Sequence, residues 1–181
     1  MRANIVFTLT GPDRVGIVEE VTGALLEADA NVETSRMARL GGEFAILMLL
    51  TVPEARRDEV ESALAYLGEQ GYTITTRPAG KAVGQIPADR HTHKILVEGA
   101  DHEGIIHEIA QGLSQRGINI ESMETGTTRA PVSGTPLFTM TALVAVPPEV
   151  DATDWCDAVV SAGQLANVDV TISPADSPGQ G

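Results

Sequence analysis

The chain has 181 residues, of which 43% are hydrophobic and 3% aromatic, and its formal net charge at pH 7 is −13. Its 12 Lys and Arg are scattered among 25 Asp and Glu, so no basic cluster can displace counterions from phosphates, and direct nucleic-acid binding is not expected. A single cysteine, no apolar run of membrane-span length and no signal-peptide pattern predict a cytoplasmic protein that inserts in no membrane.

The first two predicted elements are a strand over residues 5–9 and a helix from residue 17 to about residue 30. They are joined by Thr10-Gly11-Pro12-Asp13-Arg14-Val15-Gly16-Ile17. A glycine-containing turn at a helix start exposes unpaired backbone N–H groups at the positive end of the helix dipole. This loop is therefore a candidate binding site for an anion such as a carboxylate.

Four further elements complete the first half of the chain. We expect a strand over 31–37, a tight turn at Leu40-Gly41-Gly42-Glu43, an apolar strand over 44–52, a helix over 54–69 and a strand over 72–76. In the predicted second helix Val60, Leu64 and Leu67 share one side. The resulting order is strand, helix, strand, strand, helix, strand.

The second half repeats this order at an offset of 88 residues. The offset aligns Gly11 with Gly99, Asp13 with Asp101, and Gly16 with Gly104, and it continues to Asn31 and Asn119. After the second repeat's first hairpin strand the offset rises to 94, because Arg129-Pro136 lengthens the hairpin by six residues. An ungapped match of this length indicates an internal duplication.

The domain boundaries follow from the repeat. We expect a first domain over 3–80, a linker over 81–91, a second domain over 92–174 and a disordered tail over 175–181. In the second domain the helix over 151–164 should turn Trp155 and Val159 inward. A βαββαβ unit of this size predicts an α+β fold, a four-stranded antiparallel sheet with two helices on one face.

The two loops, each followed by an asparagine fifteen residues after its last glycine, resemble those of ACT domains, which are regulatory modules of ferredoxin-like fold. Gly11-Pro12-Asp13-Arg14-Val15-Gly16 is similar to the GPDRPG loop of that superfamily, with Val15 in place of the usual proline. The long second hairpin, Ala130 to Phe138, resembles that of the glycine cleavage system transcriptional repressor family. This resemblance implies an amino-acid-sensing regulator that works through a protein partner such as a DNA-binding activator, as a homodimer.

The resemblance also implies where the ligand binds, because in ligand-binding ACT domains the site lies between neighbouring domains. It carries over to eight positions: Gly11, Asp13, Gly16 and Asn31, and in the second repeat Gly99, Asp101, Gly104 and Asn119. The loop amides suit a carboxylate, and side-chain oxygens suit an ammonium group. Glycine is one candidate ligand.

Structural alternatives exist for the same residues. Asp13 and Asp101 stand where a helix N-cap belongs, and a capping carboxylate would occupy the amides a ligand needs. The two asparagines follow helix ends, where Asn tolerates left-handed geometry. Gly16 and Gly104 could serve close helix–strand packing, and the long hairpin could be a tolerated surface insertion.

No enzyme is expected. Cys156 beside Trp155 is more typical of core packing than of a nucleophile. His91 and His93, with Asp89 and His102 or His107 nearby in sequence, form a weak metal pattern without an accompanying cysteine, so neither a metal nor another cofactor is predicted. Besides the amino-acid sensor, two functions stay open: a ligand-free ACT interaction module, and a regulatory subunit of a separate metabolic enzyme.

Overall fold

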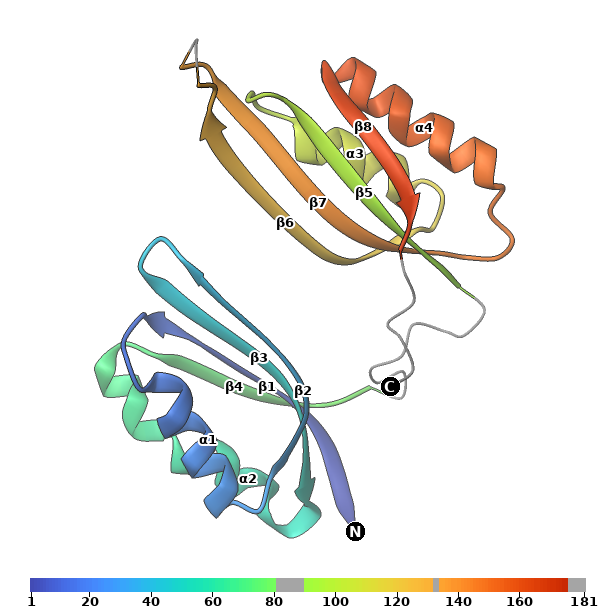
Figure 1. Cartoon of the computed structure of the whole chain (residues 1–181). Helices are drawn as coiled ribbons and strands as arrows, with labels where there is room; N and C mark the ends of the chain where they lie inside the picture. The colour runs from blue at the N-terminus through green and yellow to red at the C-terminus, as the bar shows by residue number, and fades with distance from the viewer. Residues whose placement is uncertain (81–89, 132–133, 176–181) are drawn as a thin grey trace. The chain divides into compact units, whose positions relative to one another are not determined.

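The structure, a computed structural model, describes residues 1–80, 90–131 and 134–175. It divides into two compact units, Met1–Gln85 and Ile86–Gly181, each built on its own sheet (Figure 1). Most of the expected linker 81–91 and of the expected tail 175–181 lies outside the described residues. In the described part of the chain, no helix combines the length and apolar character that crossing a membrane requires.

The first unit has four strands and four helical segments between them. In chain order these are β1 Arg2–Pro12, α1 Ile17–Glu27, β2 Asn31–Leu40, β3 Glu43–Pro53, the 3-10 turn η1 Glu54–Arg56, α2 Arg57–Ala63, the 3-10 segment η2 Ala65–Gln70 and β4 Thr73–Pro78.

The second unit repeats the pattern with an unbroken second helix. Its elements are β5 His91–Ala100, α3 Ile105–Ser114, β6 Asn119–Arg129, β7 Pro136–Val146, α4 Ala152–Leu165 and β8 Val168–Pro174.

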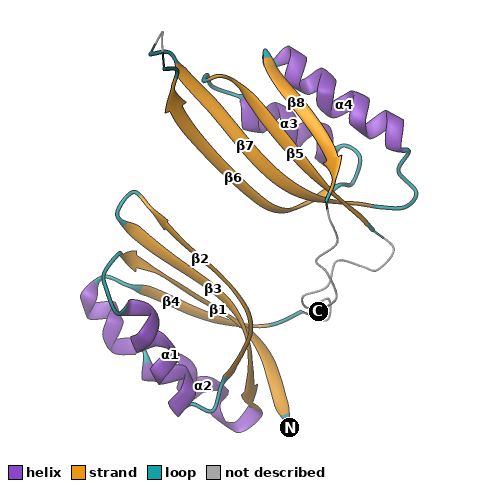
Figure 2. Ribbon diagram, in the orientation of Figure 1, coloured by secondary structure: helices purple, strands orange, loops and turns teal. Residues whose placement is uncertain are grey.

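Each unit is an antiparallel four-stranded sheet with helices on one face (Figure 2). The strand orders are β2-β3-β1-β4 and β6-β7-β5-β8, so the first and third strands of each unit are central. This is the ferredoxin-like α+β fold, and the predicted fold class is confirmed.

Strand pairing confirms the sequence repeat at single-residue resolution. Gly11 pairs with Phe44 in the first sheet, and Gly99 pairs with Phe138 in the second. The strand after each first helix carries a bulge at the same place, at Glu33 and at Glu121. Residues that the offsets of 88 and 94 align in sequence therefore also occupy equivalent positions in the two sheets.

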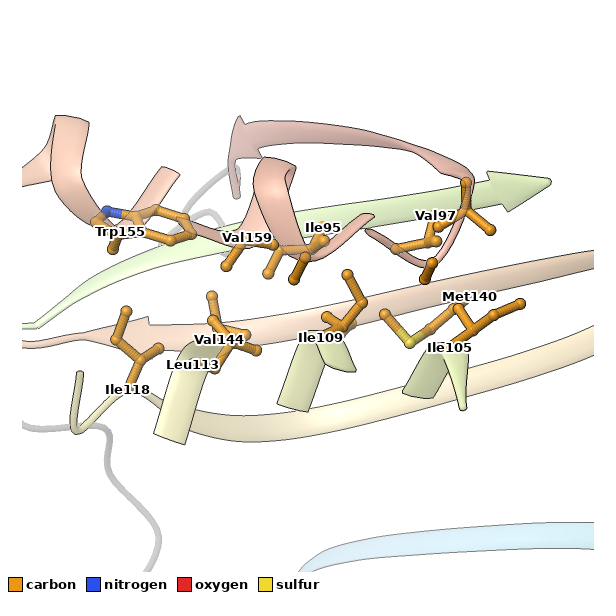
Figure 3. Packing of buried hydrophobic residues seen from close by; sticks show 14 of the residues in the cluster. Ile95, Val97, Ile105, Ile109, Leu113, Ile118, Met140, Val144, Trp155 and Val159 are labelled. Atoms are coloured by element: carbon orange, nitrogen blue, oxygen red, sulfur yellow. The ribbon is translucent and has the colours of Figure 1, made fainter. Parts of the chain in front are cut away.

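Each unit encloses its own hydrophobic core between the sheet and its helices. In the second unit Ile105, Ile109 and Leu113 of α3, spaced four residues apart, lie along one helix face and meet Trp155 and Val159 of α4 (Figure 3). The inward positions predicted for α4 are confirmed, as are those of Val60, Leu64 and Leu67 in the first unit.

The predicted helix over 54–69 is wrong in its continuity. Leu64 has φ −108° and ψ 1°, outside the α-helical region, and the chain continues in the tighter η2 segment. Short local signals cannot fix such a break, because the apolar spacing of Val60, Leu64 and Leu67 fits either geometry. All three side chains are buried despite the break.

The two hairpins differ as predicted. Gly41 and Gly42 both have positive φ, 62° and 90°, which a tight two-residue turn between twisted strands requires. The second hairpin connects β6 to β7 through the longer segment 130–135, where the Ala130 amide donates to the Thr135 carbonyl at 2.9 Å. Ser133 lies outside the described residues.

Candidate functional site

The loop before α1 is shorter than the sequence indicates, because β1 continues through Gly11 to Pro12. Only residues 13–16 connect strand to helix, and Gly16 is the N-cap with φ 91°. Gly104 plays the same part before α3 with φ 97°. No side chain caps either helix. The Asp151 carboxylate, in contrast, caps α4 by accepting from the Thr153 and Asp154 amides.

Gly16 and Gly104 are required by their backbone conformation. A Cβ placed at either position would have no heavy atom within 4 Å, so the close-packing alternative is wrong for both. The positive φ, which side-chain-bearing residues adopt at a cost, explains the glycine at each N-cap. Both helix starts are left with open space over the N-cap.

Gly11 and Gly99 have a different reason. A Cβ on Gly11 would lie 2.4 Å from Cδ1 of Tyr72, and one on Gly99 would lie 2.6 Å from Cγ1 of Val168. Tyr72 and Val168 stand at the entry to the last strand of each unit. These two glycines let that strand approach, so packing accounts for them without a ligand.

Asp13 does not cap α1, so the capping alternative is wrong. Its carboxylate accepts from Nε of Arg39 on β2 at 2.6 Å, and its amide donates to the Gly42 carbonyl at 2.9 Å. The Asp101 amide likewise donates to the Pro136 carbonyl at 3.0 Å. The position equivalent to Arg39 is Thr127, and within the described residues Asp101 forms no ion pair.

A side-chain network that the sequence does not reveal fastens the first loop. The Arg14 guanidinium pairs with Glu20 of α1, reaches Oε1 of Gln70 at 3.3 Å and lies over the Tyr72 ring, 5.7 Å from its centroid. Tyr66 donates to the second oxygen of Glu20 at 2.6 Å. These hydrogen bonds, from Tyr66 first and then Arg14, lower the pKa of Glu20. The loop is thus held by the charge of Glu20 on α1 and by the neutral polar side chain of Gln70 on η2.

The second loop is fastened differently, because His102 replaces Arg14. Its Nδ1 lies 2.9 Å from the Glu103 carbonyl oxygen, and its Nε2 lies 2.5 Å from that of Ala166, the C-cap of α4. Ala166 immediately precedes the left-handed Asn167, as Gln70 precedes the left-handed Gly71 in the first unit. Arg14 and His102 are therefore equivalent in their contacts as well as in sequence. Each bonds to the end of the last helical segment of its unit, Arg14 to Gln70 and His102 to Ala166.

The asparagines are paired with acidic side chains at the strand bulges. The Asn31 amide donates to Glu33 at 2.9 Å and the Asn119 amide to Glu121 at 2.6 Å. The hydrogen bond from Asn31, with a second from Thr51, lowers the pKa of Glu33. The left-handed alternative is wrong for Asn31, which is the first residue of β2; the left-handed residue is Asp29.

Within one unit, the structure does not bring the asparagine to the loop. Asn31 is in register with Thr51 at one end of β3, whereas Gly11 is in register with Phe44 at the other. Seven residues of strand separate those partners, roughly 23 Å at about 3.3 Å per residue. Asp13 and Gly16 do lie together at the loop, so the eight predicted residues form a loop group and an asparagine group.

The structure also shows the surroundings of His93, of Cys156 and of the candidate metal ligands. The His93 ring packs edge-on against Trp155, with centroids 5.1 Å apart. Burial, with the neighbouring Asp157, raises the pKa of the Cys156 thiol, which disfavours the reactive thiolate. Among the described residues no three His, Cys, Asp or Glu side chains gather as metal ligands; Asp89 lies outside that part of the chain.

The fold and the repeated loops define a tandem pair of ferredoxin-like modules, each with an uncapped, glycine-started first helix. Family models described as the ACT domain match residues 3–76 and 93–152. The chain belongs to the ACT-domain family, with two ACT domains in tandem.

Similar proteins agree with this assignment. The glycine cleavage system transcriptional repressor of Escherichia coli (strain K12) is 38% identical over 66 residues, which are 36% of this chain and 35% of that protein. The match therefore spans about a third of the curated repressor. A UPF0237 protein of Methanococcus maripaludis is 35% identical over 69 residues, 37% of this chain and 77% of that protein.

Two solved structures match nearly the whole chain. A crystal structure of an unknown protein from Galdieria sulphuraria has a TM-score of 0.81 at 34% identity, covering 97% of this chain and all of that one. A candidate glycine cleavage system transcriptional repressor has a TM-score of 0.71 at 23% identity, covering 98% and 99%. The second likeness concerns the fold alone.

Proposed function

We propose that this tandem ACT protein is an amino-acid-sensing regulator, not an enzyme, that acts in the cytoplasm through a protein partner and does not bind DNA itself. The observation that carries the proposal is the start of α1, where Gly16 leaves the helix uncapped beside the Asp13 carboxylate. Backbone amides and the dipole suit a ligand carboxylate, and Asp13 suits an ammonium group. A free amino acid carries both. Glycine is the first candidate, because a relative is named for the glycine cleavage system.

The proposal includes a homodimer. Asn31 and Gly16 belong to opposite ends of one unit, so a ligand that touches both needs two ACT units, and we assign the second to another copy of the chain. Ligand binding can then shift a protein–protein equilibrium, provided that the partner-bound and free forms differ in ligand affinity.

The direct test is calorimetric titration of the purified chain with each of the twenty amino acids. We expect one of them to bind, and Asp13→Ala and Asn31→Ala each to weaken it about tenfold, the range of a lost hydrogen bond to a charged group. The melting temperature should change little, because exposed ion pairs such as Asp13–Arg39 contribute about 0–1 kcal/mol. Asp157→Ala, an exposed carboxylate on α4, is the matched control.

If no amino acid binds at millimolar concentration, the sensor proposal is lost and the ligand-free interaction module takes its place.

An electrophoretic mobility shift with the purified protein tests whether the chain acts without binding DNA itself. We expect no specific shift of any DNA, because the chain carries a net charge of −13 without a basic cluster. A specific shift by the protein alone would rule out action through a partner.

The charges around the two loops favour the first as the ligand site. Val15 is fully exposed there, whereas its equivalent is Glu103, and neither Asp101 nor Glu103 forms an ion pair in the described part of the chain. We expect Val15→Glu to weaken amino-acid binding at least tenfold by repelling the ligand carboxylate, and Glu103→Val to leave it within twofold. Calorimetry measures both; equal effects of the two changes would contradict the assignment.

A further inference from the structure

The ring nitrogens of His102 face two backbone carbonyl oxygens, and no donor group of the described residues bonds to the ring. Nδ1 faces the Glu103 oxygen at 2.9 Å and Nε2 faces the Ala166 oxygen at 2.5 Å. A neutral imidazole has one N–H and one bare nitrogen, so it can satisfy only one carbonyl. The imidazolium ion has two N–H groups and satisfies both.

The surroundings of the ring also favour the cation. Ala166 is the C-cap of α4, and the C-terminus of a helix carries partial negative charge. The charged or titratable groups on the elements around the ring are Asp101 and Glu103 in the loop, His107 and Glu108 on α3, Arg129 at the end of β6, Asp154 and Asp157 on α4, and Asp169 on β8. Of these the Asp101 carboxylate acts on the imidazole as a charge, and it favours protonation.

We propose that His102 is a proton-controlled tether that joins the loop 101–104 to the C-terminal end of α4 and that loosens when the imidazole loses its proton. The equivalent tether in the first unit uses Arg14, a cation at every physiological pH. The two loops therefore differ in their response to pH: the second loop responds, and the first does not.

The direction of the pH effect follows from the two hydrogen bonds. The bond to Glu103 and then that to Ala166 raise the pKa of folded His102 above its ordinary value of about 6.5. A group whose pKa is raised by folding stabilises the folded state fully below its unfolded pKa. That stabilisation is lost as the pH rises through the folded pKa, so the second unit should weaken and its loop should loosen between about pH 6.5 and the folded value.

Two measurements test the tether on the whole chain. NMR titration of the His102 ring protons should give a higher pKa in the native protein than in the urea-unfolded protein. The Asp101 and Glu108 amides at the two ends of the loop are hydrogen-bonded to the Pro136 and Gly104 carbonyls. Hydrogen exchange should show that their protection factors, corrected for intrinsic pH dependence, fall over the same pH range. His102→Arg should remove that fall, and His102→Gln, which keeps one donor without titrating, should also remove it.

The first unit supplies the reciprocal experiment. Arg14→His should transfer a pH-dependent loss of protection to the hydrogen-bonded Asp13 and Glu20 amides, where we expect none in the native protein. A native His102 pKa at or below the unfolded value would overturn the proposal. So would an equal fall in protection in the native chain and in His102→Gln, since that fall could not come from the imidazole.

Discussion

Replacing Gly99 with alanine is expected to lower the free energy of unfolding of the second unit by about 2–3 kcal/mol. The new Cβ would lie 2.6 Å from Cγ1 of Val168 and 3.0 Å from its Cα. The Val168 side chain could rotate, but its Cα cannot withdraw, because Gly99 and Val168 are register partners in the β5–β8 ladder. Relief therefore requires the two strands to separate. Urea unfolding followed by the fluorescence of Trp155, the one tryptophan of the chain, measures the loss.

Gly112→Ala is the matched control in the same unit. Gly112 lies in α3, and a Cβ there would be 3.7 Å from Cβ of Ala162, an ordinary contact. Helix propensity favours alanine by about 0.5–1 kcal/mol, so this variant should be as stable as the native chain or slightly more so. If Gly99→Ala keeps native stability and instead weakens amino-acid binding, Gly99 serves a ligand and the packing explanation is wrong.

The prediction for Gly99 changes how the loop glycines are understood. Sequence spacing places Gly11 and Gly16 in one loop, and the resemblance to ACT domains assigns both to the ligand site. Three-dimensional context separates them, because only Gly16 has positive φ and open space around it, whereas Gly11 is buried under Tyr72. The contact joins Gly11 and Tyr72, which are 61 positions apart, so no local sequence pattern predicts it.

The repeat is what made most of the fold predictable from sequence. Apolar periodicity predicts where the strands and helices lie. Because the order of elements occurs twice, each element in one repeat supports the assignment of the equivalent element in the other. Strand register, including the matched bulges at Glu33 and Glu121, then follows the same two offsets. The break at Leu64 was not predictable, because it changes the backbone without changing which side chains are buried.

The candidate site was predictable in part. The uncapped helix starts follow from the glycines, but the ion pair of Asp13 with Arg39 depends on tertiary contact between the loop and the β2–β3 hairpin, where the Asp13 amide also bonds to the Gly42 carbonyl. Tyr66, Gln70 and the Arg14–Glu20 pair also come together only through tertiary packing. A sequence signal existed for Glu20, which recurs as Glu108 at the offset of 88 residues. Its partners had none.

Trp155 provides the largest expected loss of stability. It is 1% exposed and projects from α4 into the core of the second unit (Figure 3). The His93 ring packs edge-on against it, with ring centroids 5.1 Å apart. Truncation to alanine removes the indole contacts and leaves a cavity that a sheet fixed by its ladder cannot close. We expect Trp155→Ala to cost about 3–5 kcal/mol, measured by urea unfolding followed by far-ultraviolet circular dichroism.

Leu165→Ala on the same helix is the control for Trp155→Ala. Leu165 is the last residue of α4 and is 82% exposed, so its truncation should change the unfolding free energy by less than about 0.5 kcal/mol. Trp155→Phe should fall between the two, because it keeps an aromatic ring against His93 while giving up part of the volume. If Trp155→Ala costs less than about 1 kcal/mol, the core of the second unit collapses around the cavity. In that case α4 is not held by close packing, and the distance from Ala166 to His102 is not fixed tightly enough for a proton to control the loop.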